Sequence, residues 1–139
     1  MGPFRITSVS RNIMQDLPAT EMPPFQPILK DGCLYQEVRV LNRHGLHARP
    51  SAMFFERILR PNGDALDLAF NVHGRNGAEE FVEIRSVFDL MALGIESGTM
   101  ITVRVMFQNS GERIGAGEAI ARSIYDLFLK GFDDKPSGS

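Results

Sequence analysis

The positions of the prolines divide this chain into two unlike parts. Five of its eight prolines fall within the first 27 residues, a stretch with no sustained period of 2 or 3.6. Proline removes a backbone donor and fixes φ, so long regular elements are disfavoured there. We therefore expect an arm over residues 1–31, disordered or laid over the surface, then a folded domain over 32–133 and a flexible tail over 134–139.

Short strand patterns recur through the folded part. Apolar and polar residues alternate over Tyr35–Val40 and again over Leu66–Phe70. A weaker strand pattern surrounds Phe81–Val82, and a fourth covers Met100–Phe107. In the fourth, either set of alternate residues could face the core, and we expect the buried set to be Ile101, Val103 and Val105.

Helical spacing appears in three segments among these strands. One covers Ala48–Leu59 and ends at Pro61–Gly63, and a short one follows the Ser86–Asp89 pair, which has the spacing of a capping box. The last contains Ile120–Phe128 and stops at Gly131. The order βαββαβα predicts an α+β open-faced sandwich, a four-stranded antiparallel sheet with three helices on one face.

Composition excludes several classes of protein. Fifteen basic and seventeen acidic residues leave a formal charge of -2, too balanced to predict a nucleic-acid partner. The single cysteine, Cys33, excludes an internal disulfide and fits a reducing compartment. No stretch approaches the roughly 18 apolar residues of a membrane span, and charged residues interrupt any signal-peptide core. A cytoplasmic protein without membrane insertion is expected.

The segment Gly45–Pro50 combines residues suited to phosphoryl chemistry, at the start of the first helix. The first amides of a helix have no internal partners and carry the positive end of its dipole. We therefore expect the His47 imidazole to be neutral and nucleophilic, and a phosphoryl group on it to meet the amides of Ala48 and Arg49. The Arg49 guanidinium is permanently charged and suits phosphate oxygens. Gly45 is expected to leave the imidazole face unobstructed.

The residues alone leave other interpretations open. A single histidine at a helix start is more often a partial cap or a surface residue, and a pure interaction module would use His47 only in that way. His44 and His47 form an H-x-x-H pair, but no acidic or cysteine partner has suitable spacing, so no metal or other cofactor is predicted. A hydrolase would need a nucleophile or metal pattern such as G-x-S-x-G or H-E-x-x-H, which is absent.

Four segments together resemble a known family. They are residues 36–38, 45–50, 85–90 and 93–94, and they closely resemble the histidine-containing phosphocarrier protein, HPr, of the bacterial phosphoenolpyruvate-dependent phosphotransferase system. The resemblance covers roughly residues 34–132. The family's fold, a four-stranded antiparallel sheet with three helices on one face, agrees with the element order read from the periods.

The resemblance implies a role for two residues of the helix start. In that family the matching histidine receives a phosphoryl group on Nδ1 from enzyme I and hands it to enzyme II A domains, which assigns this role to His47. Arg49 would stabilise the phosphoryl group in transit. The chain is then expected to be a monomeric phosphocarrier for sugar uptake or regulation, and not an enzyme.

The resemblance also implies a docking patch and a regulatory serine. Exposed apolar residues after the matching serine contact partners in the family, so we expect Leu46, Val87 and Phe88 to form a docking patch near His47. In some bacteria a dedicated kinase phosphorylates the matching serine, which makes Ser86 a candidate regulatory site. A serine in this position is also what a helix N-cap needs.

The chain departs from the usual pattern of the family in three places. The arm is longer than usual, the interval from His47 to Ser86 is longer, and Leu127–Asp134 is similar to the nitrogen-related branch. The alternative function is therefore a regulatory interaction module of that branch, controlled by Ser86 phosphorylation and not acting in sugar transport.

Overall fold

Five antiparallel strands form the sheet of this protein. The computed structural model describes residues 21–75, 77, 80–107 and 114–133. The sheet has the order β1-β2-β5-β3-β4. Its strands are β1 (Ile28–Lys30), β2 (Cys33–Arg39), β3 (Leu66–Val72), β4 (Val82–Glu83) and β5 (Met100–Phe107).

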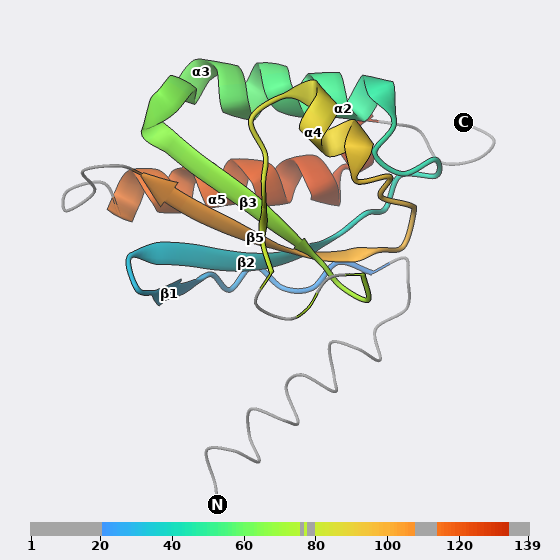
Figure 1. The fold of residues 1–139 in the computed structure, drawn as a ribbon. Coiled ribbons are helices and arrows are strands. Elements are labelled where there is room, and N and C mark those ends of the chain that lie inside the picture. Colours follow the sequence, from blue (N-terminus) through green and yellow to red (C-terminus); the bar gives the residue numbers. More distant parts are fainter. Residues whose placement is uncertain (1–20, 76, 78–79, 108–113, 134–139) are drawn as a thin grey trace, which may run out of the picture.

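Three helical units cover one face of this sheet, and the other face carries no helix over the described residues (Figure 1). The first unit runs from α2 (Ala48–Phe54) through the π-helical η1 (Phe55–Leu59) into α3 (Arg60–Asn62) and the 3-10 turn η2 (Gly63–Ala65). The others are α4 (Val87–Ala92) and α5 (Ile114–Leu129), which is followed by the short η4 (Gly131–Asp133). The predicted α+β open-faced sandwich is confirmed. None of these helices is long and apolar enough to cross a membrane, over the ranges given above.

The core lies between the sheet and the helices. Alternate side chains of β5 face the helices and are buried in it. Ile101, Val103 and Val105 are all buried, as predicted from their spacing. Phe54 of α2, Phe70 of β3 and Phe128 of α5 make edge-to-face contacts with one another at centroid distances of 5.7 to 6.3 Å. This aromatic cluster fixes the first helix, and with it the start of α2, relative to the sheet.

The sheet has one strand more than the four predicted, because β1 pairs with β2 in the segment interpreted as an arm. Asp31 and Gly32 connect the two strands, with φ values of 53° and 80°. Positive φ at both central residues is the geometry of a tight hairpin turn whose twist matches its strands. The predicted boundary between residues 31 and 32 therefore falls inside a hairpin. The arm over residues 1–20 and the tail over 134–139 lie outside the described residues.

Residues 21–27, which we call the N-terminal strap, pack against both β2 and α5. The Tyr125 hydroxyl donates a 2.6 Å hydrogen bond to the Pro23 carbonyl, and the Phe25 ring contacts Tyr125 edge to face. The Gln36 side chain accepts from the Gln26 amide at 2.9 Å and donates to the Pro24 carbonyl at 3.0 Å. Burial is the main cause that raises the pKa of Tyr125, so its hydroxyl keeps the proton that this contact requires.

Candidate functional site

The loop between β2 and α2 is anchored at several points before it reaches His47. Asn42 is buried, and its side-chain amide donates a hydrogen bond to the Gly45 carbonyl. The Gly45 amide in turn donates to the Asn42 carbonyl at 3.2 Å. The Leu46 amide donates to the Ile95 carbonyl at 2.9 Å, which ties the loop to the turn after α4. The backbone just before His47 is therefore fixed by contacts distant in sequence.

Gly45 is needed for close packing against that turn. Its φ is +72°, and a Cβ at this position would lie 2.3 Å from the Ile95 carbonyl oxygen. No side chain fits there, and the backbone conformation itself favours glycine. The glycine thus serves the contact between two loops; the sequence had suggested only that it keeps the imidazole face clear.

Leu46 and Ser51 lock the helix start from inside. Leu46 is 4% exposed and belongs to the core, and the buried Ser51 hydroxyl donates to its carbonyl at 3.1 Å. The prediction that Leu46 takes part in an exposed docking patch is wrong, because its side chain points into the core as the anchor of the loop. His47, the next residue, is exposed on the surface.

His47 occupies the N-cap position of α2, with extended backbone angles of φ -79° and ψ -164°. Its carbonyl accepts the first helical hydrogen bond, from the Ser51 amide at 3.1 Å. Its imidazole makes no capping hydrogen bond, so the side chain is not engaged as a cap. Arg49 is exposed in the first turn, while Pro50 is buried beside it where its missing amide donor costs little.

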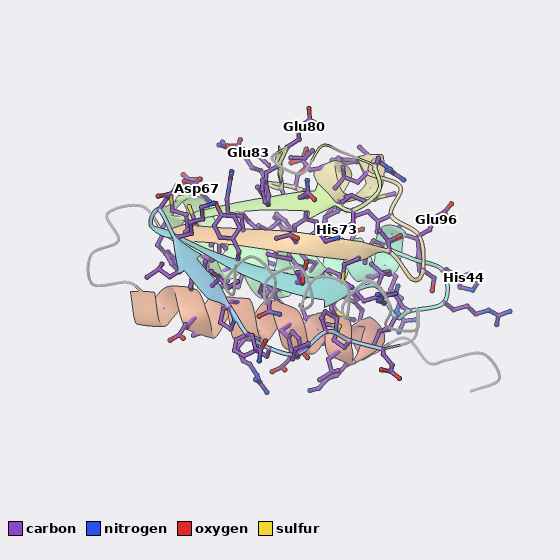
Figure 2. The ribbon with its side chains drawn as sticks, turned by 90° about the horizontal axis from the view of Figure 1, so that it is seen from below. His44, Asp67, His73, Glu80, Glu83 and Glu96 are labelled. Carbon is purple, nitrogen blue, oxygen red and sulfur yellow. The ribbon has the colours of Figure 1, made fainter. Side chains whose placement is uncertain are left out.

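A second imidazole lies next to His47. The rings of His44 and His47 are 6.1 Å apart between centroids and meet edge to face at 69°. Figure 2 places His44 and Glu96 at one end of the molecule, with His73 over the sheet. Within the part of the chain that the structure describes, no group of three His, Cys, Asp or Glu side chains is arranged to hold a metal ion.

Ser86 starts α4 with the capping box predicted from the sequence. Its hydroxyl accepts from the Asp89 amide at 3.2 Å, and the Asp89 carboxylate accepts from the Ser86 amide at 3.1 Å. The same carboxylate also accepts from the Arg85 amide at 2.8 Å. Ser86 is therefore the N-cap of α4. At the other end of α4, the Arg75 guanidinium donates to the carbonyls of Leu93 and Gly94.

α4 lies beside α2 (Figure 1). It carries the exposed apolar residues of this region. The Phe88 side chain is 79% exposed and Met91 is 42% exposed, whereas Val87 is half-buried. We call Val87, Phe88 and Met91 the α4 patch. Met91 was not among the predicted docking residues, although it stands three residues after Phe88 and so shares its helix face.

His73 does not belong to this site. Its Nε2 is 2.7 Å from the Thr102 hydroxyl and 3.7 Å from a Glu37 carboxylate oxygen, on the face of the sheet without helices. Burial lowers the pKa of His73; the nearby Glu37 carboxylate opposes this and Arg39 adds to it. The ring is therefore neutral at neutral pH.

Comparisons with known proteins identify the family to which this chain is similar. The family model described as "PTS HPr component phosphorylation site" matches residues 34–124, which include His47, Arg49 and Ser86. The multiphosphoryl transfer proteins of Salmonella typhimurium and Salmonella typhi are each 30% identical to this chain over 97 residues, or 69% of the chain. Those residues cover 24% of each relative, so the chain spans about a quarter of their length.

A solved structure shares the fold. HPr-C-His from Thermoanaerobacter tengcongensis superposes with a TM-score of 0.51 at 19% identity, covering 73% of this chain and 97% of its own. Both proteins therefore belong to the class of α+β open-faced sandwiches. The chain belongs to the HPr family of the phosphotransferase system, because the family model covers well over half of its length.

Proposed function

We propose that this chain is a stoichiometric phosphocarrier of the cytoplasm. It accepts a phosphoryl group on His47 from enzyme I, with phosphoenolpyruvate as the ultimate donor, and passes it to enzyme II A domains for sugar uptake or regulation. The observation that supports this best is the position of His47, exposed at the start of α2 on a fixed loop and with no capping hydrogen bond from its side chain.

The site suits an in-line transfer between two proteins. The bond from phosphorus to the donor breaks as a bond forms between phosphorus and a ring nitrogen of His47. The phosphoryl oxygens then meet the amides of the first turn of α2, which have no carbonyl partner inside the helix. The Arg49 guanidinium in that turn adds a fixed positive charge. Since His47 is exposed, a partner can approach along the line of the new bond.

Incubation with phosphoenolpyruvate and enzyme I, followed by intact-mass measurement, tests the proposal. We expect one added phosphate that is labile in acid and stable in base, as for a phosphohistidine. An unchanged mass with an enzyme I that phosphorylates another HPr would contradict the proposed function.

We further propose that the α4 patch docks enzyme I, so Phe88→Ala should weaken that docking by about tenfold or more. The side chain is 79% exposed, so its truncation should change the free energy of unfolding by less than about 0.5 kcal/mol. Titration calorimetry with enzyme I and thermal unfolding measure the two effects.

Ile28 is a matched control, because it is an exposed apolar side chain on β1, in a different part of the fold. Ile28→Ala should leave the affinity for enzyme I unchanged. Equal losses in both variants would show that docking depends on general surface hydrophobicity and would remove the α4 patch from the site.

We propose that Ser86 is a regulatory site at which a serine kinase adds a negatively charged phosphate. Ser86→Asp, which imitates that charge, should lower the rate of His47 phosphorylation by roughly three- to tenfold at low salt. Asp caps a helix about as well as Ser, and the nearby Asp89 carboxylate offsets the gain from the helix dipole. Stability should therefore stay within about 0.5 kcal/mol of the wild-type value. A time course of phosphorylation in quenched samples measures the rate, and thermal unfolding measures the stability.

Ser86→Asn is the matched neutral control, since it keeps the cap without adding charge. It should be phosphorylated on His47 at the wild-type rate. If Ser86→Asp also retained that rate at low salt, Ser86 would be a helix cap only.

A further inference from the structure

His44 and His47 form a pair of imidazoles held by one backbone. Both side chains are exposed, and their rings meet edge to face with centroids 6.1 Å apart. The loop that carries them is fixed by the Asn42 amide, by the tight approach of Gly45 to Ile95, and by the Leu46 amide. These contacts fix the backbone positions from which the two rings extend.

A phosphoryl group on His47 would be a close neighbour of the second ring. Its oxygens lie two bonds beyond the ring nitrogen that carries phosphorus, and the centroid of the His44 ring is 6.1 Å from that of His47. A protonated imidazole has two N–H donors, and a charge-assisted hydrogen bond to phosphate is among the stronger polar contacts. Of the common side chains, imidazole is the one that ordinarily changes charge close to neutral pH.

The other charged groups around this end come from three elements. Arg43 lies on the same loop, Arg49 in the first turn of α2, and Glu96 on the turn after α4. The backbone of Glu96 approaches Gly45 closely, so its element is packed against the loop. Together these side chains carry two positive charges and one negative charge. Phosphorylation of His47 adds a negative charge to this set.

We propose that protonated His44 binds the phosphoryl group carried by His47, so that phosphorylation of this chain and protonation of His44 favour each other. The inference rests on the proposed function. The transfer step itself is unchanged: the donor's bond to phosphorus breaks and a bond to His47 nitrogen forms. His44 contributes an N–H hydrogen bond to a phosphoryl oxygen and neither gives up its proton nor accepts phosphorus.

The direct test follows the histidine ring resonances by NMR as a function of pH. The chain has three histidines, so each ring can be followed separately in protein without a histidine tag. After phosphorylation with phosphoenolpyruvate and enzyme I, the titration midpoint of His44 should rise by about one pH unit. His73 is the internal reference, because its ring is held by Thr102 on the open face of the sheet and its midpoint should not move.

A second measurement uses the equilibrium of phosphoryl transfer between enzyme I and this chain, at about pH 5.5 and at about pH 8. In the wild-type chain, the phosphorylated fraction should be larger at the lower pH, because protonated His44 favours it. His44→Phe, which keeps a ring without an N–H, should lose this increase. The ratio of the wild-type and His44→Phe equilibrium constants should change by up to about tenfold between the two pH values, because a one-unit shift corresponds to that factor. His44→Arg, which carries a permanent positive charge, should favour the phosphorylated form at both pH values.

The outcomes separate this inference from the proposed function. No phosphate uptake by the wild-type chain contradicts the proposed function. Phosphate on His47 with an unmoved His44 midpoint overturns the role of His44 alone. Equal pH dependence in wild type and His44→Phe would overturn it as well, and phosphate found on His44 would overturn both.

Discussion

Replacing His47 with alanine is expected to abolish phosphate uptake from phosphoenolpyruvate and enzyme I. The variant lacks the nucleophilic ring nitrogen, and neither of the other two histidines occupies a helix start. Its fold should persist, since His47 is exposed and its side chain makes no capping hydrogen bond. Intact mass after incubation measures uptake, and circular dichroism checks the fold.

His73→Ala is the matched control for this variant. It removes a histidine hydrogen-bonded to Thr102 on the open face of the sheet and should leave phosphate uptake at the wild-type level. A persistent acid-labile phosphate in His47→Ala would show that another residue is the acceptor. Loss of uptake in both variants would indicate a general effect on folding.

The sequence predicted the elements whose signals are local. The alternation over Met100–Phe107 identified both the strand and its buried side, because a side chain on a strand points to one face or the other. The Ser86–Asp89 pair identified the start of α4, because a capping box involves only residues within one helical turn. The first helix was also found, although it continues past Pro61 to Asn62. Pro61 has no amide hydrogen to donate to a helical carbonyl, and the π-helical stretch Phe55–Leu59 stands just before it.

The features that the sequence could not show depend on contacts between distant residues. Ile28–Lys30 has few strand signals, and it forms β1 because the Asp31–Gly32 turn brings it back along β2. Leu46 was assigned to the docking patch from the family resemblance, but it is buried, and hydrogen bonds with the Ile95 carbonyl and the Ser51 hydroxyl hold its backbone. Nothing in the sequence near His47 indicates that Ile95, almost fifty residues later, sets its position.

That distant contact makes Gly45→Ala the second substitution with a large expected effect. Alanine at φ +72° costs about 1–2 kcal/mol in conformational strain. The new Cβ would also lie 2.3 Å from the Ile95 carbonyl oxygen, and relieving that overlap requires backbone shifts that cost about another 1–3 kcal/mol. The shift should break the hydrogen bond from Leu46 to Ile95, one residue before His47. A misplaced acceptor should then slow phosphorylation by enzyme I on the order of a hundredfold.

Gly74→Ala separates the two causes in that variant, because Gly74 has φ +83° and a Cβ added there would meet open space, with no neighbouring atom of the described residues within 4 Å. Backbone strain alone should lower its free energy of unfolding by about 1–2 kcal/mol, and its phosphorylation rate should equal that of the wild type. Chemical denaturation measures the change in stability. The difference in stability between the two variants then measures the overlap with Ile95. If Gly45→Ala lost no more stability than Gly74→Ala and was phosphorylated at the wild-type rate, the turn after α4 would not position His47. The site would then depend on the start of α2 alone.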